Sequence, residues 1–154
     1  MDNDDVKKTR YNLVKFISQF HKLFADIFKR DPNDKYCCNK NQTRAILFIG
    51  RNKITTPTIL GQSMDMEKGS LTTLLGSLEE TNLIFRKIDP SDKRRTLVHL
   101  TEDGKVYYNE LENKFNEKIE EVFSSLSQED LKIFSNNLET LVKILEKGEG
   151  YNDR

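Results

Sequence analysis

Apolar residues recur every three or four positions near both ends of the chain, which is the spacing of amphipathic helices. This spacing predicts a helix from Val6 to about Phe28, with a wide face rich in phenylalanine. It also predicts a long helix that Thr101 caps and that runs to about Ser125. A last helix begins after Ser127, and its apolar positions advance by three and four in turn, as in a coiled coil. They are Leu131, Phe134, Leu138, Leu141 and Leu145.

The middle of the chain carries shorter helical patterns. One helix is predicted from about Asn41 to Asn52, and a short one over about 57–63. Thr56 and Pro57 mark the start of the short helix, because threonine caps free backbone N–H groups and proline suits the first helical position. A further helix over about 67–81 has four leucines on one face. It should end at Asn82, because asparagine tolerates the left-handed backbone that ends helices.

Two short apolar runs follow, "LIFRKI" and "TLVHL", on either side of the turn-forming residues Asp89-Pro90-Ser91-Asp92. They predict the two strands of a hairpin. The fold class is therefore mainly α (α+β): a winged helix-turn-helix with a two-stranded wing, between N- and C-terminal dimerisation helices. The predicted division is 1–35 for the N-terminal helix, 36–100 for the winged domain and 101–154 for the C-terminal helices. A small winged domain cannot bury the outer stripes, so pairing with a second copy is expected.

Composition and charge agree with one domain of ordinary size. The chain has 154 residues, of which 36% are hydrophobic and 32% charged, with a net charge of zero. The charge is uneven: residues 1–50 carry +4, residues 51–100 carry +2 and residues 101–154 carry −6. A surface that is basic all over is therefore excluded, but local basic patches are not.

The helix over 67–81 is a candidate for insertion into the DNA major groove. Its polar side holds small hydroxyl side chains and one cation, which suit contacts to bases and phosphates. These residues are Lys68, Ser70, Thr72, Thr73 and Ser77. Gly69 and Gly76 would allow a close approach. A plain solvent-exposed helix is the alternative, but such faces usually carry glutamate, lysine and arginine.

The hairpin turn adds three consecutive cations, Lys93, Arg94 and Arg95. An arginine placed in a narrow minor groove gains from the strong negative potential there. Taken alone, this run is best interpreted as a solvated turn. Because the run follows a hydroxyl-rich helix directly, it predicts that the hairpin is the second DNA-contacting element of a winged helix.

These residues resemble a known family. The segment "TPTILGQSM…GSLTTLLGSLEETNLIFRKIDPSDKRRTLVHLTEDGK" is similar to the DNA-binding core of the multiple antibiotic resistance regulator (MarR) family. The resemblance implies a homodimer that binds a pseudo-palindromic operator, usually as a repressor. It implies that Arg94 is the wing-tip arginine of the minor groove and that Asp92 supports it. The chain departs from the family at Asn82, where glycine is usual, and at Gly76 and Glu67.

The resemblance also implies a small phenolic or aromatic effector at the junction of the winged domain and the outer helices. Six aromatic residues are expected on helices that meet there: Phe16, Phe20, Phe24, Tyr107, Tyr108 and Phe115. Such a stripe is more often simple core. A ligand site therefore remains an open alternative at this point.

Other chemistries find little support in the sequence. The adjacent Cys37 and Cys38, with the distant His21 and His99, match no zinc spacing, so no metal or cofactor is expected. Two reduced thiols are the simplest interpretation, with a redox switch as the alternative. No nucleophile elbow or phosphate-binding glycine loop occurs, so an enzyme is not expected.

Two further expectations concern partners and place. A winged-helix module that binds another protein instead of DNA remains an alternative, with the wing cations facing an acidic partner. The polar start "MDNDDVKKTR" and the absence of an apolar run of roughly 18 residues predict a cytoplasmic protein without membrane contact.

Overall fold

A computed structural model describes residues 3–29 and 33–149. The chain divides into two compact units, Met1–Lys118 and Ile119–Arg154. The first holds the helices α1 to α4, the wing and most of α5, and the second holds the end of α5 and α6. The fold is mainly helical, with six α-helices and a two-stranded antiparallel wing among the described residues, as the sequence predicts.

Helix α1 (Asn3–Phe24) is followed at once by the 3-10 helix η1 (Ala25–Phe28). The sequence predicted one continuous helix to Phe28, and this boundary was wrong. The tighter winding of η1 is a common way to end an α-helix, and it brings Phe28 against the core. The turn expected at Asp31 and Pro32 lies outside the described residues.

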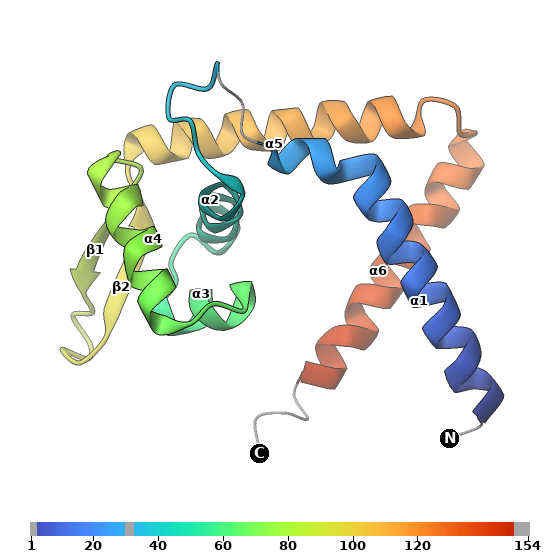
Figure 1. Cartoon of the computed structure of the whole chain (residues 1–154), viewed down its shortest axis with the longest axis horizontal. Helices are drawn as coiled ribbons and strands as arrows, with labels where there is room; N and C mark the ends of the chain where they lie inside the picture. Colours follow the sequence, from blue (N-terminus) through green and yellow to red (C-terminus); the bar gives the residue numbers. More distant parts are fainter. Residues whose placement is uncertain (1–2, 30–32, 150–154) are drawn as a thin grey trace. The chain divides into compact units, whose positions relative to one another are not determined.

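Three helices build the helix-turn-helix: α2 (Lys40–Asn52), α3 (Pro57–Met64) and α4 (Lys68–Glu80). Asn39 caps α2, and its side chain accepts from the backbone N–H of Gln42 at 3.1 Å while Gln42 bonds back to Asn39. Thr56 caps α3 as predicted, accepting from the Ile59 N–H at 3.3 Å. Figure 1 shows the three helices gathered beside the hairpin.

The hairpin consists of β1 (Ile84–Ile88) and β2 (Thr96–Leu100), paired antiparallel with Ile84 opposite Leu100. Thr55 adds a bridge to Val98 on the other side of β2. Asn82 has a φ of 58°, so it takes the left-handed backbone predicted for the end of α4. The hairpin therefore starts two residues after the helix-ending turn and stays close to α4.

One hydrophobic core joins α2, α3, α4, the hairpin and the start of α5. Seven large side chains in it are almost completely buried: Ile46, Ile49, Leu60, Leu75, Leu78, Leu83 and Val98. Burial of a side chain of this size contributes about 1.5–3 kcal/mol each. The core thus joins α4 and the two wing strands.

Helix α5 (Glu102–Phe123) begins at the end of β2, and α6 (Gln128–Glu149) follows after a short turn. The hydroxyl of Thr101 accepts from the Gly104 N–H at 2.9 Å, and the hydroxyl of Ser127 accepts from the Asp130 N–H at 3.0 Å. Both caps were predicted. In the part of the chain that the structure describes, no helix has the length and hydropathy needed to cross a bilayer.

Candidate DNA interface

Helix α4, the predicted recognition helix, has a buried side and an exposed side. Its leucines, Leu71, Leu74, Leu75 and Leu78, are buried in the core. Lys68, Ser70, Thr72 and Thr73 are exposed, as the sequence predicts for a groove-binding face. A rigid apolar anchor on one side and short polar groups on the other are what a helix needs to lie in a major groove.

The threonines on this face have their hydroxyl hydrogens occupied. The Oγ1 of Thr72 donates to the Lys68 carbonyl at 2.8 Å, and that of Thr73 donates to the Gly69 carbonyl at 3.2 Å. Each threonine therefore presents an acceptor lone pair and a methyl group to the outside. A methyl group can contact the thymine methyl, and the oxygen can accept from an amino group on a base edge.

Ser77 lies apart from the other predicted contacts. It is half-buried, and its hydroxyl accepts from the Gln42 side-chain amide at 2.8 Å. This bond joins α4 to α2. Contact of Ser77 with DNA stays a prediction.

The wing turn is held by the carboxylate of Asp89. Its Oδ1 accepts from the backbone N–H and the hydroxyl of Ser91, at 2.8 and 2.6 Å. These bonds, with the nearby Arg95 charge, lower the pKa of Asp89. The Asp89 N–H bonds to the Arg95 carbonyl at 2.9 Å and so closes the turn. The cationic tip is thus presented by an ordered loop.

Arg94 projects from this turn, with 92% of its side chain exposed. Asp92 Oδ1 accepts from the Arg94 backbone N–H at 3.0 Å and from its Nε at 3.3 Å. The remaining guanidinium nitrogens stay directed to solvent, where they could reach DNA. Lys93 and Arg95 on either side are exposed as well. These two hydrogen bonds agree with the prediction that Asp92 supports Arg94.

An ion pair joins the recognition helix to the wing. Arg86 on β1 donates its Nε to Glu79 on α4 at 2.9 Å. The guanidinium lowers the pKa of Glu79, and the carboxylate raises the pKa of Arg86. Both side chains are about two-thirds buried, so the pair has a more defined geometry than a freely exposed one.

The sequence did not identify Gln42, Glu79 or Arg86 as parts of this region. All three belong to pairs that join different elements: Gln42 bonds to Ser77 across α2 and α4, and Glu79 pairs with Arg86 across α4 and β1. Helical periodicity relates residues on one helix and says nothing about partners on another. The capping box of Asn39 and Gln42 joins residues only three apart, so this pattern is the signal that could have pointed to Gln42.

The six aromatic residues expected at one junction separate into different surroundings. Phe20 and Phe24 on α1 lie 5.1 Å apart, and Phe24 stacks on Phe115 of α5 at 6.1 Å between ring centroids. Tyr107 instead is buried near Asp34, to which its hydroxyl donates a hydrogen bond. The ring of Tyr108 packs against Gly50.

A hollow of about 270 Å³ opens beside the first group. Its walls come from α1, η1, α2, α3 and α5. The lining residues are Phe20, Phe28, Arg44, Leu47, Phe48, Arg51, Ser63, Met64 and Phe115. Aromatic rings and two arginines thus meet at one place, which we call the aromatic pocket.

The two cysteines differ in their surroundings. Cys38 is buried, and this burial raises the pKa of its thiol. Cys37 is partly exposed, has a φ of 48°, and its Sγ donates to the Asp34 carbonyl at 3.1 Å. Among the described residues, no three His, Cys, Asp or Glu side chains gather to hold a metal ion.

Comparisons with known proteins cover both the sequence and the fold. The sequence pattern of the MarR family matches residues 39–95, which run from the cap of α2 to the wing turn. The organic hydroperoxide resistance transcriptional regulator of Bacillus subtilis is 30% identical over 118 residues, which are 73% of this chain and 75% of that protein. The chain belongs to the MarR family. It is therefore a DNA-binding transcriptional regulator and not an enzyme, as the sequence predicts.

Further relatives agree with the MarR assignment. The HTH-type transcriptional regulator MhqR of Bacillus subtilis is 31% identical over 74 residues, 48% of this chain and 51% of that protein. A MarR family protein from Bacillus stearothermophilus has the same fold, with a TM-score of 0.73 at 19% identity, over 95% of this chain and 99% of that one. Streptococcus pneumoniae FabT, solved in complex with DNA, matches over the same shares with a TM-score of 0.66 and 19% identity.

Proposed function

We propose that this MarR protein is a homodimeric repressor that binds a pseudo-palindromic operator and leaves it when a small aromatic ligand binds. Each protomer would place α4 in a major groove and its wing in the adjacent minor groove. Two winged domains would then lie about one DNA turn apart, roughly 34 Å.

One observation supports the proposed geometry of DNA binding. The exposed hydroxyls of Thr72 and Thr73 and the exposed Arg94 belong to elements that the Glu79–Arg86 pair and the common core hold together. Lys68, Lys93 and Arg95 flank them and would neutralise phosphates. Because these contacts release counterions from DNA, the affinity should fall steeply as salt is raised.

The exposed apolar faces of the outer helices support a dimer. Tyr11 and Val14 on α1 are 67% and 63% exposed, and Ile144 and Leu145 on α6 are 62% and 59% exposed. Exposed apolar area of this kind marks an interaction surface. A second copy with the same two stripes would bury both of them and set the spacing of the winged domains.

The aromatic pocket is our candidate for the effector site. It is lined by α2 and α3 of the helix-turn-helix and by the outer helices α1 and α5. A ligand in it would therefore change the angle between the helix-turn-helix and the outer helices. Arg44 and Arg51 could bind an acidic group while the phenylalanines contact a ring. Arg51 already donates to Glu112 on α5 at 3.1 Å, a bond that an anionic ligand would compete with. NadR, solved with 4-hydroxyphenylacetate, has a similar fold, with a TM-score of 0.64 and 23% identity over 87% of this chain and 92% of that one.

Release by oxidation is the second candidate for the signal. The nucleophilic form of cysteine is the thiolate, and the raised pKa of Cys38 disfavours it. Cys37 is the more accessible of the two thiols. If oxidation releases the protein, peroxide should weaken DNA binding in the wild type but not in Cys37→Ser. Equal affinity of the wild type before and after peroxide would remove this candidate.

Selection of bound DNA from a random pool tests the main proposal. We expect a symmetric site with half-site centres about 10 base pairs apart. Loss of that preference in Thr72→Ala with Thr73→Ala would assign base contacts to α4. Recovery of no preferred sequence would instead favour the alternative, a winged-helix module that binds another protein.

A further inference from the structure

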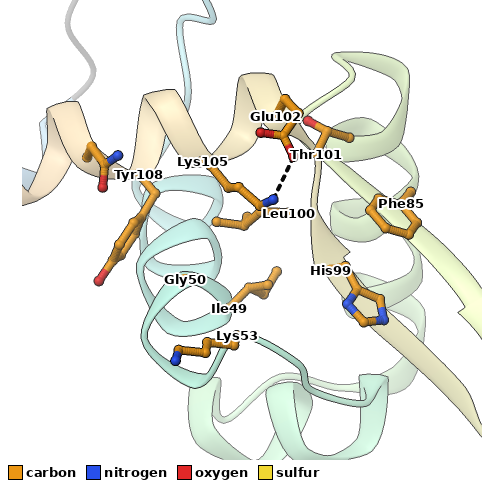
Figure 2. A pocket seen from close by; sticks show the side chains of 11 residues that line it. Ile49, Gly50, Lys53, Phe85, His99, Leu100, Thr101, Glu102, Lys105 and Tyr108 are labelled. Atoms are coloured by element: carbon orange, nitrogen blue, oxygen red, sulfur yellow. Dashed lines mark hydrogen bonds and ion pairs between the residues drawn. The ribbon is translucent and has the colours of Figure 1, made fainter.

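A second and larger hollow, of about 780 Å³, lies behind the wing. It shares no lining residue with the aromatic pocket. Its walls come from the C-terminal turn of α2, the two wing strands and the first turns of α5, as Figure 2 shows. We call it the wing hollow. Its volume lies within the range of small-molecule sites.

The inner walls of the wing hollow are apolar. Ile49 and Leu100, both buried in the core, form part of the lining, and Phe85 extends it along β1. The Tyr108 ring lies directly on the backbone of α2, since a Cβ added to Gly50 would meet its ring carbon at 2.3 Å. Glycine at this position therefore lets the aromatic ring close one side of the hollow.

The rim carries cations. Lys53 and Lys105 both line the hollow, and the Lys105 amine pairs with Glu102 at 2.6 Å. Two ammonium groups against one carboxylate leave a net positive charge while His99 is neutral. Lys53 also has a φ of 62°, a backbone conformation that carries a conformational cost for a residue other than glycine.

His99 also lines the wing hollow. Its ring stacks on Phe85 at 5.1 Å between centroids. Its Nε2 is inaccessible to solvent and has no hydrogen-bond partner in the described part of the chain. Buried polar atoms are nearly always bonded, and His99 Nε2 is an exception among the described residues, as is Thr55 Oγ1.

We propose that the wing hollow binds a small organic carboxylate with an apolar body. The body would lie against Ile49, Leu100 and the Tyr108 ring, and the carboxylate would bond to Lys53 and Lys105. A single negative charge matches the net charge of the rim, whereas a purely inorganic anion would leave the apolar walls unused. This site is additional to the proposed effector pocket, and its occupancy does not depend on DNA binding.

Methyl-labelled protein titrated with benzoate and hexanoate tests the site directly. The methyl groups of Ile49 and Leu100 report on the wing hollow, and that of Leu47 reports on the aromatic pocket. Ligands of this size are expected to bind with a Kd on the order of 1 mM. Benzamide, hexanamide and inorganic phosphate serve as probes that lack either the charge or the apolar body.

Two variants separate the hollows. We expect Lys53→Gln with Lys105→Gln to weaken carboxylate binding at Ile49 and Leu100 about tenfold or more, because charge-assisted hydrogen bonds are lost. Arg44→Gln is the matched control, since it removes a cation from the other pocket and should leave these shifts unchanged.

The outcomes are exclusive. Saturable carboxylate shifts at Ile49 and Leu100 that the double lysine variant abolishes support the site. Shifts confined to Leu47, equal binding of the amides or of phosphate, unchanged binding in the double lysine variant, or no shift at all would overturn it. None of these readings depends on whether the protein is a repressor.

Discussion

At the scale of single residues, Arg94 on the wing has an exposed side chain whose base is held by hydrogen bonds to Asp92. The Arg94 side chain is almost wholly in solvent, yet its backbone and Nε both bond to Asp92. Holding a long side chain near one conformation lowers the entropy lost on binding. The arrangement therefore explains how an exposed cation could contribute to affinity beyond simple attraction to phosphate.

Arg94→Ala should weaken operator binding by roughly 1–3 kcal/mol, or about fivefold to 150-fold, and leave thermal stability unchanged. The matched control is Lys29→Ala, which removes another exposed cation from a local ion pair, with Asp26. Fluorescence anisotropy with the selected operator measures both variants. Wild-type affinity in Arg94→Ala would contradict the wing assignment.

His99 should make stability depend on pH. Burial, and secondarily the charge of Lys87, lowers its pKa below that of the unfolded chain. Between these two pKa values the unfolded chain binds more protons, so stability should fall as pH drops from about 7 through 6.5 and below. His99→Gln should reduce this fall, and His21→Gln, at an exposed position on α1, should not. Thermal melts of the three proteins at pH 7.5 and 5.5 measure the difference.

At the scale of elements, the junction of α4, the hairpin and α5 depends on close backbone packing. The Leu83 carbonyl accepts from the Thr101 N–H at 3.1 Å, and the Thr101 hydroxyl donates to the Asn82 carbonyl at 2.6 Å. Gly104 lies against this contact, because a Cβ there would come within 1.9 Å of the Leu83 oxygen. The start of α5 can therefore lie beside the end of α4 only without a side chain at 104.

Gly104→Ala should destabilise the protein by at least about 2 kcal/mol, since either the hydrogen bond or the helix must shift. Gly76→Ala is the matched control on α4, where an added Cβ meets no atom within 4 Å. There alanine should stabilise by up to about 1 kcal/mol through its higher helix propensity. Urea unfolding of both variants gives the values, and similar changes at the two sites would contradict the packing argument.

At the scale of the whole molecule, most of the large apolar side chains that are exposed in the described part of the chain lie on α1 and α6. In unit Ile119–Arg154, the rings of Phe123 and Phe134 pack at 4.8 Å, but Leu138, Leu141 and Leu145 stay exposed. The 3,4 spacing of this stripe suits pairing with another helix. Because residues 101–154 carry a charge of −6, we expect this acidic third of the chain to face away from DNA.

Removal of residues 127–154 should abolish the dimer, because the α6 stripe then has no counterpart. Sedimentation velocity would report a monomer for the truncated chain and a dimer for the full chain. The wing hollow and the core lie before residue 119. The truncated protein should therefore stay folded, and its circular dichroism should show the helical signal of the helices that remain. A truncated chain that still sediments as a dimer would place the interface elsewhere.

The sequence by itself determined the order of the elements and the caps at Thr56, Thr101 and Ser127, and it predicted α4 and the wing turn as the segments that contact DNA. Thr56, Asn82, Thr101 and Ser127 act through neighbours a few residues away, and local hydrogen bonding decides their effect. The same local rules located α4 and the cationic turn within one or two residues.

Only the tertiary structure decided which distant side chains meet. It pairs Glu79 with Arg86 and Ser77 with Gln42, and it parts Tyr107 from Tyr108 although they are adjacent in the chain. It also ends the first α-helix at Phe24 and continues it as the 3-10 helix η1, against a periodicity that continues to Phe28. Periodicity states which face of a helix is apolar, but the partner of that face depends on packing of the whole chain, which no local pattern contains.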